Sequence, residues 1–258
     1  MLFRSKLWEQ YGDDYLNGIQ NTLILALVAT LLGCIIGFVC GILNTIPCAK
    51  TDPPVKRFFI KLIRVIVRIY VEVFRGTPMM LQAVFIYYGL PYFTGNAVQW
   101  PSVWMAAILV VSINTGAYMA ESVRGGIISI DPGQTEGAKA IGMTHVQTMT
   151  SVILPQALRL SIPGWANEFS ILLKDSAVCY VLGTQDIMAR TAAVAARTHE
   201  ALALYAAAGV IYFVLTIIVL KLLHRLEEQE YRPCRILVMN TGEQYWNREW
   251  EKCPILEV

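Results

Sequence analysis

Long apolar runs alternate with short polar segments along this chain of 258 residues. About 20 residues of helix cross a hydrocarbon core of about 30 Å, and backbone groups in lipid must be satisfied within each helix. The pattern therefore predicts an all-α, polytopic membrane protein. Its five transmembrane helices are expected near 17–46, 77–93, 102–123, 150–183 and 201–222.

Small residues recur at every fourth position within the first apolar run, at Ala29, Gly33, Gly37 and Gly41. Residues at this spacing share one face of a helix. In membranes, stripes of small residues let a neighbouring backbone approach closely. We therefore expect a close contact between the first span and another helix.

A second pattern places charged residues three or four positions apart, at Arg57, Lys61, Arg64, Arg68 and Glu72, with apolar residues between them. This spacing predicts a basic amphipathic helix at a membrane surface. It is equally compatible with a cytoplasmic extension of the next span. The two interpretations do not exclude each other.

Composition agrees with the membrane assignment, because 55% of residues are hydrophobic, 16% are charged and mean hydropathy is +0.49. A net charge of +2 gives no indication of nucleic-acid binding. The segment between the first two spans is basic, whereas 94–101 holds no Lys or Arg. By the positive-inside rule the amino terminus is outside and the carboxyl terminus is cytoplasmic. Neither the cysteines nor the histidines have the spacing of a metal site.

The polar segment after the third span is then cytoplasmic and contains two sets of helix-start signals. Asp131 can cap a helix, with Gln134 completing a capping box, and Gly142 ends it. Thr144 begins a second short helix that runs toward Pro155. Two short capped helices in a cytoplasmic loop predict a docking element.

The same segment resembles the EAA loop of bacterial ABC importer permeases at Glu136, Gly137, Ala138, Gly142, Leu154 and Pro155. Gly137 replaces the usual Ala, which lowers helix propensity by about 1 kcal/mol. Val152 replaces the usual Ile, and the spacing is unchanged. In that family the loop sits in a groove of the ATPase, so the resemblance implies that these residues couple transport to ATP hydrolysis. For Glu136, the simpler alternative is a solvated acid favoured by the helix dipole.

Further motifs are similar to those of polar amino-acid permeases, at 18–23, 72–78, 117–126, 167–168 and 174–176. The resemblance implies a MetI-like permease fold in a bacterial plasma (inner) membrane. It also implies two ABC ATPase subunits carrying ATP and Mg, a second permease subunit and an extracytoplasmic amino-acid-binding protein. No cofactor is expected in this chain, which lacks a phosphate-binding GxxxxGK[ST] loop.

Polar residues inside the third and fourth spans are candidates for contact with an amino-acid substrate: Asn114, Tyr118, Glu121, Asn167 and Glu168. The first three share one helix face, and the last two follow a predicted break at Pro163. Acids within spans are costly, which favours a functional role. Glu168 would then face an ammonium or a cationic side chain. Alternatively, Glu121 pairs with Arg124, and Glu168 with Lys174.

We therefore predict a permease domain over 1–230, with a cytoplasmic coupling loop at 124–149, followed by a cytoplasmic tail, 231–258, whose role stays open. The chain is expected to be a transport subunit and not an enzyme, since no nucleophile or metal-ligand motif is present. A secondary transporter or channel that works alone is the alternative, but it would be expected to show repeated halves. Which amino acid is carried, and whether the second permease is identical or related, stays open.

Overall fold

The computed structural model describes residues 5–46 and 53–240, with side chains described over 11–46 and 53–225. Within this part every regular element is helical, which confirms the predicted all-α class. In chain order the elements are α1 (Ser5–Thr45), α2 (Pro54–Gly76), α3 (Met79–Val84), the π-helical turn η1 (Phe85–Gly89), α4 (Leu90–Phe93), α5 (Val103–Ser129), α6 (Pro132–Ala140), α7 (His145–Thr148), the π-helical turn η2 (Met149–Ile153), α8 (Leu154–Asp175), the 3-10 turn η3 (Ser176–Leu182), α9 (Ile187–Thr198) and α10 (Ala201–Asn240).

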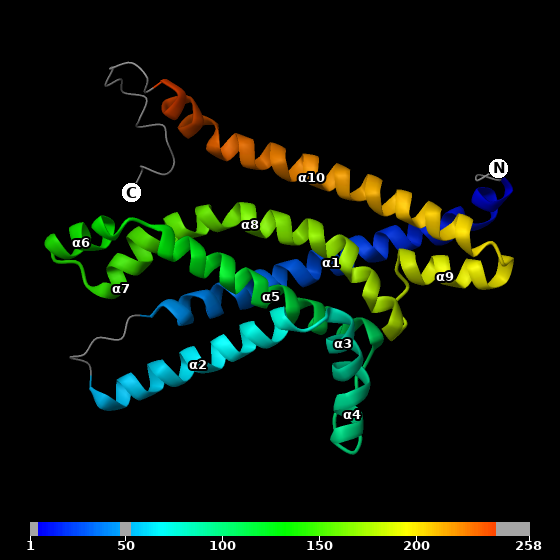
Figure 1. Cartoon of the computed structure of the whole chain (residues 1–258), viewed down its shortest axis with the longest axis horizontal. Helices are drawn as coiled ribbons and strands as arrows, with labels where there is room; N and C mark the ends of the chain where they lie inside the picture. Colours follow the sequence, from blue (N-terminus) through cyan, green and yellow to red (C-terminus); the bar gives the residue numbers. More distant parts are fainter. Residues whose placement is uncertain (1–4, 47–52, 241–258) are drawn as a thin grey trace.

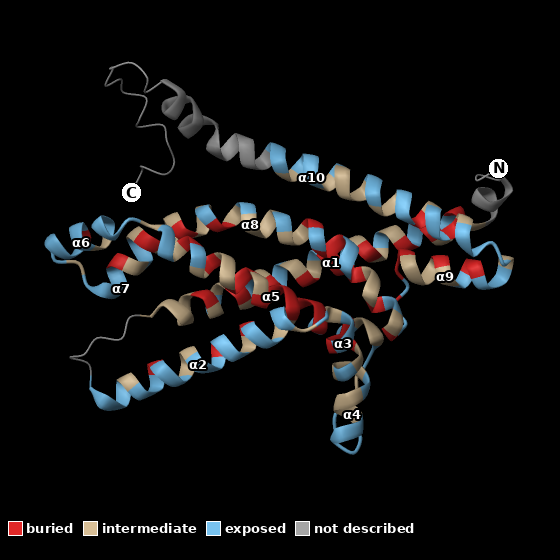
Figure 2. Ribbon diagram, in the orientation of Figure 1, coloured by how far each residue is buried: buried red, intermediate tan, exposed pale blue. Residues whose placement is uncertain are grey.

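The long helices run lengthwise through the molecule, with α6 and α7 at one end and α9 at the other (Figure 1). Helix α5 packs against α1, α2 and α8, and so lies at the centre of the bundle. Buried residues gather on the facing sides of α1 and α5, whereas α10 is largely exposed (Figure 2). Exposed apolar surface of this kind is typical of a face that meets lipid or a partner.

Three helices are long and apolar enough to cross a membrane, over Tyr11–Thr45, Val103–Ser129 and Ala201–Arg225. They correspond to the first, third and fifth predicted spans. The second predicted span, 77–93, consists of the short elements α3, η1 and α4, which follow directly on α2. The total of five spans therefore stays a prediction.

The small-residue stripe of α1 faces α5 at very short range. Cβ atoms built on Gly33, Gly37 and Gly41 would lie 3.0, 2.5 and 2.6 Å from their nearest neighbours on α5. Those neighbours are Thr115, Met119 and Val123, which are themselves spaced by four residues. The predicted close helix contact is confirmed, and we call it the α1–α5 seam.

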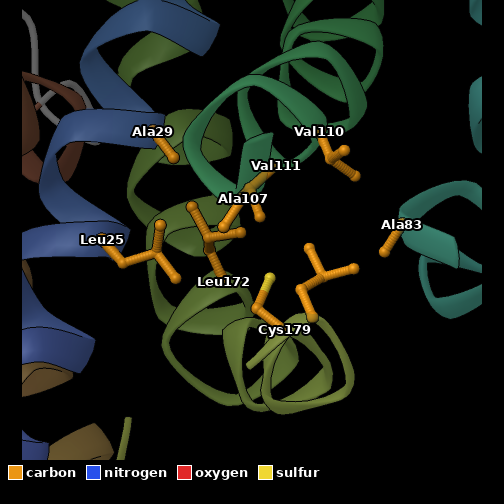
Figure 3. Packing of buried hydrophobic residues seen from close by; sticks show 9 residues of the cluster. Leu25, Ala29, Ala83, Ala107, Val110, Val111, Leu172 and Cys179 are labelled. Carbon is orange, nitrogen blue, oxygen red and sulfur yellow. The ribbon is translucent and has the colours of Figure 1, made fainter. Parts of the chain in front are cut away.

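Beyond the seam, apolar side chains from α1, α3, α5, α8 and η3 meet in one cluster (Figure 3). Its labelled members are Leu25, Ala29, Ala83, Ala107, Val110, Val111, Leu172 and Cys179. Most of these residues are small, which lets the helices approach closely, or β-branched, which restricts their side-chain rotamers. The cluster fixes α3 and the end of α8 relative to α5.

The helix is continuous at Pro155 and at Pro163, so the predicted break at Pro163 is wrong. Helix α7 passes through η2 into α8 without a gap, and Pro155 lies directly after the π-helical turn, where the hydrogen-bonding pattern changes from π to α. Pro163 lies inside α8, which continues to Asp175. Close packing supports the helix here, since a Cβ on Gly126 of α5 would lie 2.7 Å from Ser161 Oγ.

The predicted tail begins as part of a helix, because α10 extends to Asn240. The side chains beyond 225, and all of 241–258, lie outside the described residues. The role of the tail therefore stays open.

Candidate transport pathway and coupling hairpin

The chain turns sharply between α2 and α3, at Gly76, Thr77 and Pro78. A proline cannot donate a backbone hydrogen bond, so carbonyl groups in the preceding turn need other partners. Gln82 Nε2 donates to the carbonyl oxygens of Phe74 and Thr77, both at 2.9 Å. These bonds turn the break into a defined structure instead of a loose link.

Helix α5 supports the same break through Asn114, which is buried. Its Nδ2 donates to Phe74 O at 3.1 Å and to Gln82 Oε1 at 2.9 Å. Both amide hydrogens are used in this way. The Asn114 side chain therefore fixes the end of α2 against α5, and its Oδ1 is left to accept a further hydrogen bond.

A cavity of about 470 Å³ lies beside this break, between α2, α5 and α8, and we call it the binding cavity. Its volume suits a small ligand. Charges of opposite sign line it, with Arg75 from α2 and with Glu168 and Asp175 from α8. Its other polar lining residues are Thr77, Asn114, Thr115 and Tyr118.

The structure brings together three of the five residues that the sequence suggested for substrate contact: Asn114, Tyr118 and Glu168. Glu121 lies elsewhere and pairs with Arg124, whose Nε donates to Glu121 Oε2 at 3.0 Å. This favours the ion-pair interpretation of Glu121. Asn167 is exposed and is absent from the lining of the binding cavity.

The alternative partner for Glu168, Lys174, makes no ion pair with it in the described part of the chain. Asp175 and Arg75 also line the cavity, although the sequence did not single them out as candidates for substrate contact. A signal for Asp175 exists, since it follows Glu168 by seven residues, which is about two helical turns. Arg75 is the last charged residue before the break at Gly76. It therefore lies in the final turn of α2.

At the other end of α5, helices α6 and α7 form a compact hairpin, which we call the coupling hairpin (131–148). Asp131 Oδ1 accepts a hydrogen bond from the Gly133 amide at 2.6 Å and so caps α6. The predicted capping box with Gln134 does not form, because Asp131 bonds the second helical residue instead of the third. Thr144 begins α7 as predicted, with a complete capping box in which Gln147 Oε1 accepts from the Thr144 amide at 2.8 Å.

Gly142 turns the hairpin, with φ of +85°. L-residues other than Gly rarely adopt this left-handed conformation. The turn lets the Gly142 and Met143 amides donate back to Lys139 O and Ala138 O, both at 3.0 Å. The sequence prediction that Gly142 ends the first helix is confirmed.

The hairpin exposes most of its surface, including some large apolar side chains. Ala138 is buried, whereas Glu136 and Gly137 are exposed. Ile141 is 79% exposed and Val146 is 68% exposed. The remaining residues of the loop pattern, Leu154 and Pro155, are partly buried at the start of α8. The hairpin therefore carries exposed apolar groups as well as an exposed acid.

Residues 48–232 match the protein family described as binding-protein-dependent transport system inner membrane component. The chain belongs to this family. Membership confirms the family prediction made from the coupling loop and supports a transport subunit over a transporter that works alone.

Relatives and solved structures agree with this assignment. The arginine transport system permease protein ArtQ of Bacillus subtilis is 36% identical over 203 residues, covering 79% of this chain and 86% of the relative. The octopine transport system permease protein OccM of Rhizobium radiobacter is 31% identical over 226 residues, covering 86% and 87%.

Among solved structures, a chain from an amino acid ABC transporter crystallised with histidines is 32% identical. The two align with a TM-score of 0.76 over 89% of this chain and 100% of that one. A chain of the MetNI methionine ABC transporter, 21% identical, aligns with a TM-score of 0.63 over 84% of this chain and 94% of that one. The predicted MetI-like fold is confirmed.

Proposed function

We propose that this chain is the membrane permease of an ATP-driven importer of polar amino acids, and that the binding cavity receives the substrate. The supporting observation is the opposite charge of its walls, with Arg75 on one side and Glu168 and Asp175 on the other. An amino acid brings an ammonium and a carboxylate into a region of low dielectric constant. Each needs a counter-charge there, because an unpaired ion is expensive to desolvate.

In this proposal Arg75 binds the substrate carboxylate, since a guanidinium presents two parallel donors to it. Glu168 faces the ammonium, and Asn114 Oδ1 accepts a hydrogen bond from it. Asp175 adds a second negative charge to the wall. One positive and two negative side chains leave the cavity with a charge of −1, which favours an amino acid whose own side chain is cationic.

The coupling hairpin is proposed to dock on one of two ATPase subunits, which hydrolyse ATP with Mg. Glu136, Ile141 and Val146 supply the exposed charge and apolar surface for that contact. A second permease subunit and an extracytoplasmic binding protein complete the importer. The distribution of Lys and Arg supports a plasma (inner) membrane orientation with the amino terminus outside and the hairpin and carboxyl terminus inside.

The test is substrate binding by the purified transporter complex carrying Glu168→Gln, measured by calorimetry with L-arginine, L-glutamine and L-glutamate as cationic, neutral and anionic probes. Loss of a charge-assisted bond should weaken L-arginine binding by roughly tenfold or more. Asn167→Ala is the matched control, because Asn167 lies on the same helix outside the cavity. Equal affinities for all three probes in the wild type, or an unchanged affinity for L-arginine in Glu168→Gln, would contradict the proposal.

A further inference from the structure

A second cavity, of about 630 Å³, lies nearer the coupling hairpin, and we call it the arginine cavity. Its charged lining residues are Arg64, Arg68, Glu72, Arg75, Glu121 and Arg124. It shares a single lining residue with the binding cavity, namely Arg75. Arg75 therefore stands at the boundary between the two spaces.

The position of Arg75 is defined by α5. Its guanidinium carbon lies 5.4 Å from the centre of the Tyr118 ring, a distance at which the ring face attracts a cation. Tyr118 lines the binding cavity, and Glu121, three residues further along α5, lines the arginine cavity. Arg75 thus stacks on Tyr118, which lines the binding cavity. Glu121 of the arginine cavity lies about one helical turn further along α5.

Arg75 lines each cavity together with an acid, Glu168 in the binding cavity and Glu121 in the arginine cavity. Within the described part of the chain it makes a direct ion pair with neither of them. A Cβ built on the next residue, Gly76, would meet no atom within 4 Å, so there is open space beside the backbone directly after Arg75. The guanidinium therefore has one carboxylate acceptor in the lining of each cavity.

We propose that Arg75 passes the substrate from the binding cavity to the arginine cavity by exchanging its carboxylate partner for Glu121. In the binding cavity its guanidinium holds the substrate carboxylate. Turning toward Glu121 breaks that contact, and the carboxylate then meets the arginines of the second cavity. This step deepens the proposed function and rests on it.

The charges of the arginine cavity fit a transit site. Without Arg75 it has three positive side chains, Arg64, Arg68 and Arg124, against two negative ones, Glu72 and Glu121. Arg124 is already paired with Glu121. The surplus positive charge attracts a carboxylate, whereas a cationic side chain is repelled, which favours onward release over retention.

The experiment compares L-arginine with L-argininamide, which has no carboxylate, for binding to the detergent-purified complex. The wild type should prefer L-arginine by roughly tenfold or more, as expected for a charge-assisted contact. Arg75→Gln should lower this preference to near unity by weakening L-arginine alone. Arg75→Lys keeps the positive charge but lacks the two parallel donors of a guanidinium. This variant should give an intermediate preference.

Lys61→Gln is the matched control, because Lys61 is an exposed cation on the same helix, α2, and lines neither cavity; its preference should equal that of the wild type. Glu121→Gln should bind L-arginine as the wild type does but transport it several-fold more slowly into proteoliposomes. An unchanged preference in Arg75→Gln, or normal uptake by Glu121→Gln, would overturn the exchange. A wild type that binds no amino acid at all would contradict the proposed function itself, which distinguishes that failure from a failure of the exchange.

Discussion

Helices α9 and α6 begin with the same local device at opposite ends of the molecule. Asp186 caps α9 by accepting a hydrogen bond from the Ala189 amide at 2.8 Å, and Asp131 caps α6 from the Gly133 amide at 2.6 Å. Asp186 is fully buried, whereas Asp131 is exposed. An aspartate cap at the start of each helix therefore does not show how either end of the molecule is held in place.

The difference lies in the surroundings of each helix. Helix α9 is fastened to α1, since Asn21 Nδ2 donates to Gln185 O at 2.7 Å and Arg190 pairs with Asp14 at 3.0 Å. Helix α6 makes its main contacts with α7, inside the coupling hairpin, and with η2, which directly follows the hairpin. The α9 end is thus held by its own chain, whereas the hairpin leaves most of its surface exposed.

The largest expected effect comes from breaking the α1–α5 seam, which connects the two ends. In Gly37→Leu, the new Cβ alone would lie 2.5 Å from Met119 Cβ and 2.9 Å from the Ala120 amide nitrogen. Because backbone atoms cannot yield as side chains do, we expect a loss of more than about 3 kcal/mol of stability. Size-exclusion chromatography of the solubilised protein should show little folded material.

Gly209→Leu provides the control for the seam, because a Cβ on Gly209 of α10 would meet no atom within 4 Å. That variant should be recovered in wild-type amounts. If Gly37→Leu were recovered equally well, the close approach of α1 and α5 would not be needed for folding.

A smaller effect, on activity alone, is expected in the coupling hairpin. Gly142→Leu forces an L-side chain into φ of +85°, at a cost of about 1–2 kcal/mol, and the hairpin reshapes to relieve it. A comparable loss of docking free energy weakens ATPase contact by about tenfold. We expect ATP-driven uptake to fall by a similar factor at normal membrane levels, with Glu136→Lys behaving alike through charge reversal.

Gly137→Ala is the matched control in the same hairpin, since its Cβ would meet no atom within 4 Å and Ala favours the helix. It should transport as the wild type does. Normal uptake by both Gly142→Leu and Glu136→Lys would show that the hairpin does not couple the permease to its ATPase.

Features set by near neighbours in the sequence were predictable. The seam follows from the spacing of Gly33, Gly37 and Gly41, and the turn at Gly142 from helix-end chemistry. The cap at Asp131 was predicted, but its box with Gln134 was not formed, because either of two amides can satisfy the same carboxylate.

Features set by packing between distant segments were not predictable. Pro163 predicts a break, yet close contact with α5 supports a continuous α8. Arg75 and Asp175 line the same binding cavity although they are one hundred positions apart in the sequence. No local sequence pattern around either residue predicts that the two lie close together. Asn167 and Glu168 are neighbours in sequence, but consecutive helical residues point in different directions, so only Glu168 lines the cavity.

The smallest expected effect returns to the two caps and depends on pH. Burial raises the pKa of Asp186 to about 6 from an ordinary value of 3.8, although the hydrogen bond from the Ala189 amide acts against this shift. A carboxyl group whose pKa is higher in the folded state stabilises the fold most when protonated. Stability from Asp186 is therefore present below pH 3.8 and is lost as the pH rises to about 6, by at most about 3 kcal/mol.

Asp186→Asn keeps a capping oxygen and removes the titration. The variant should unfold at a higher temperature than the wild type at pH 7.5, and the difference should shrink at pH 5, as measured by thermal unfolding in detergent. Equal pH dependence in Asp186→Asn and the wild type would mean that Asp186 is ionised without penalty, and the contrast between a buried and an exposed cap would then carry no energetic weight.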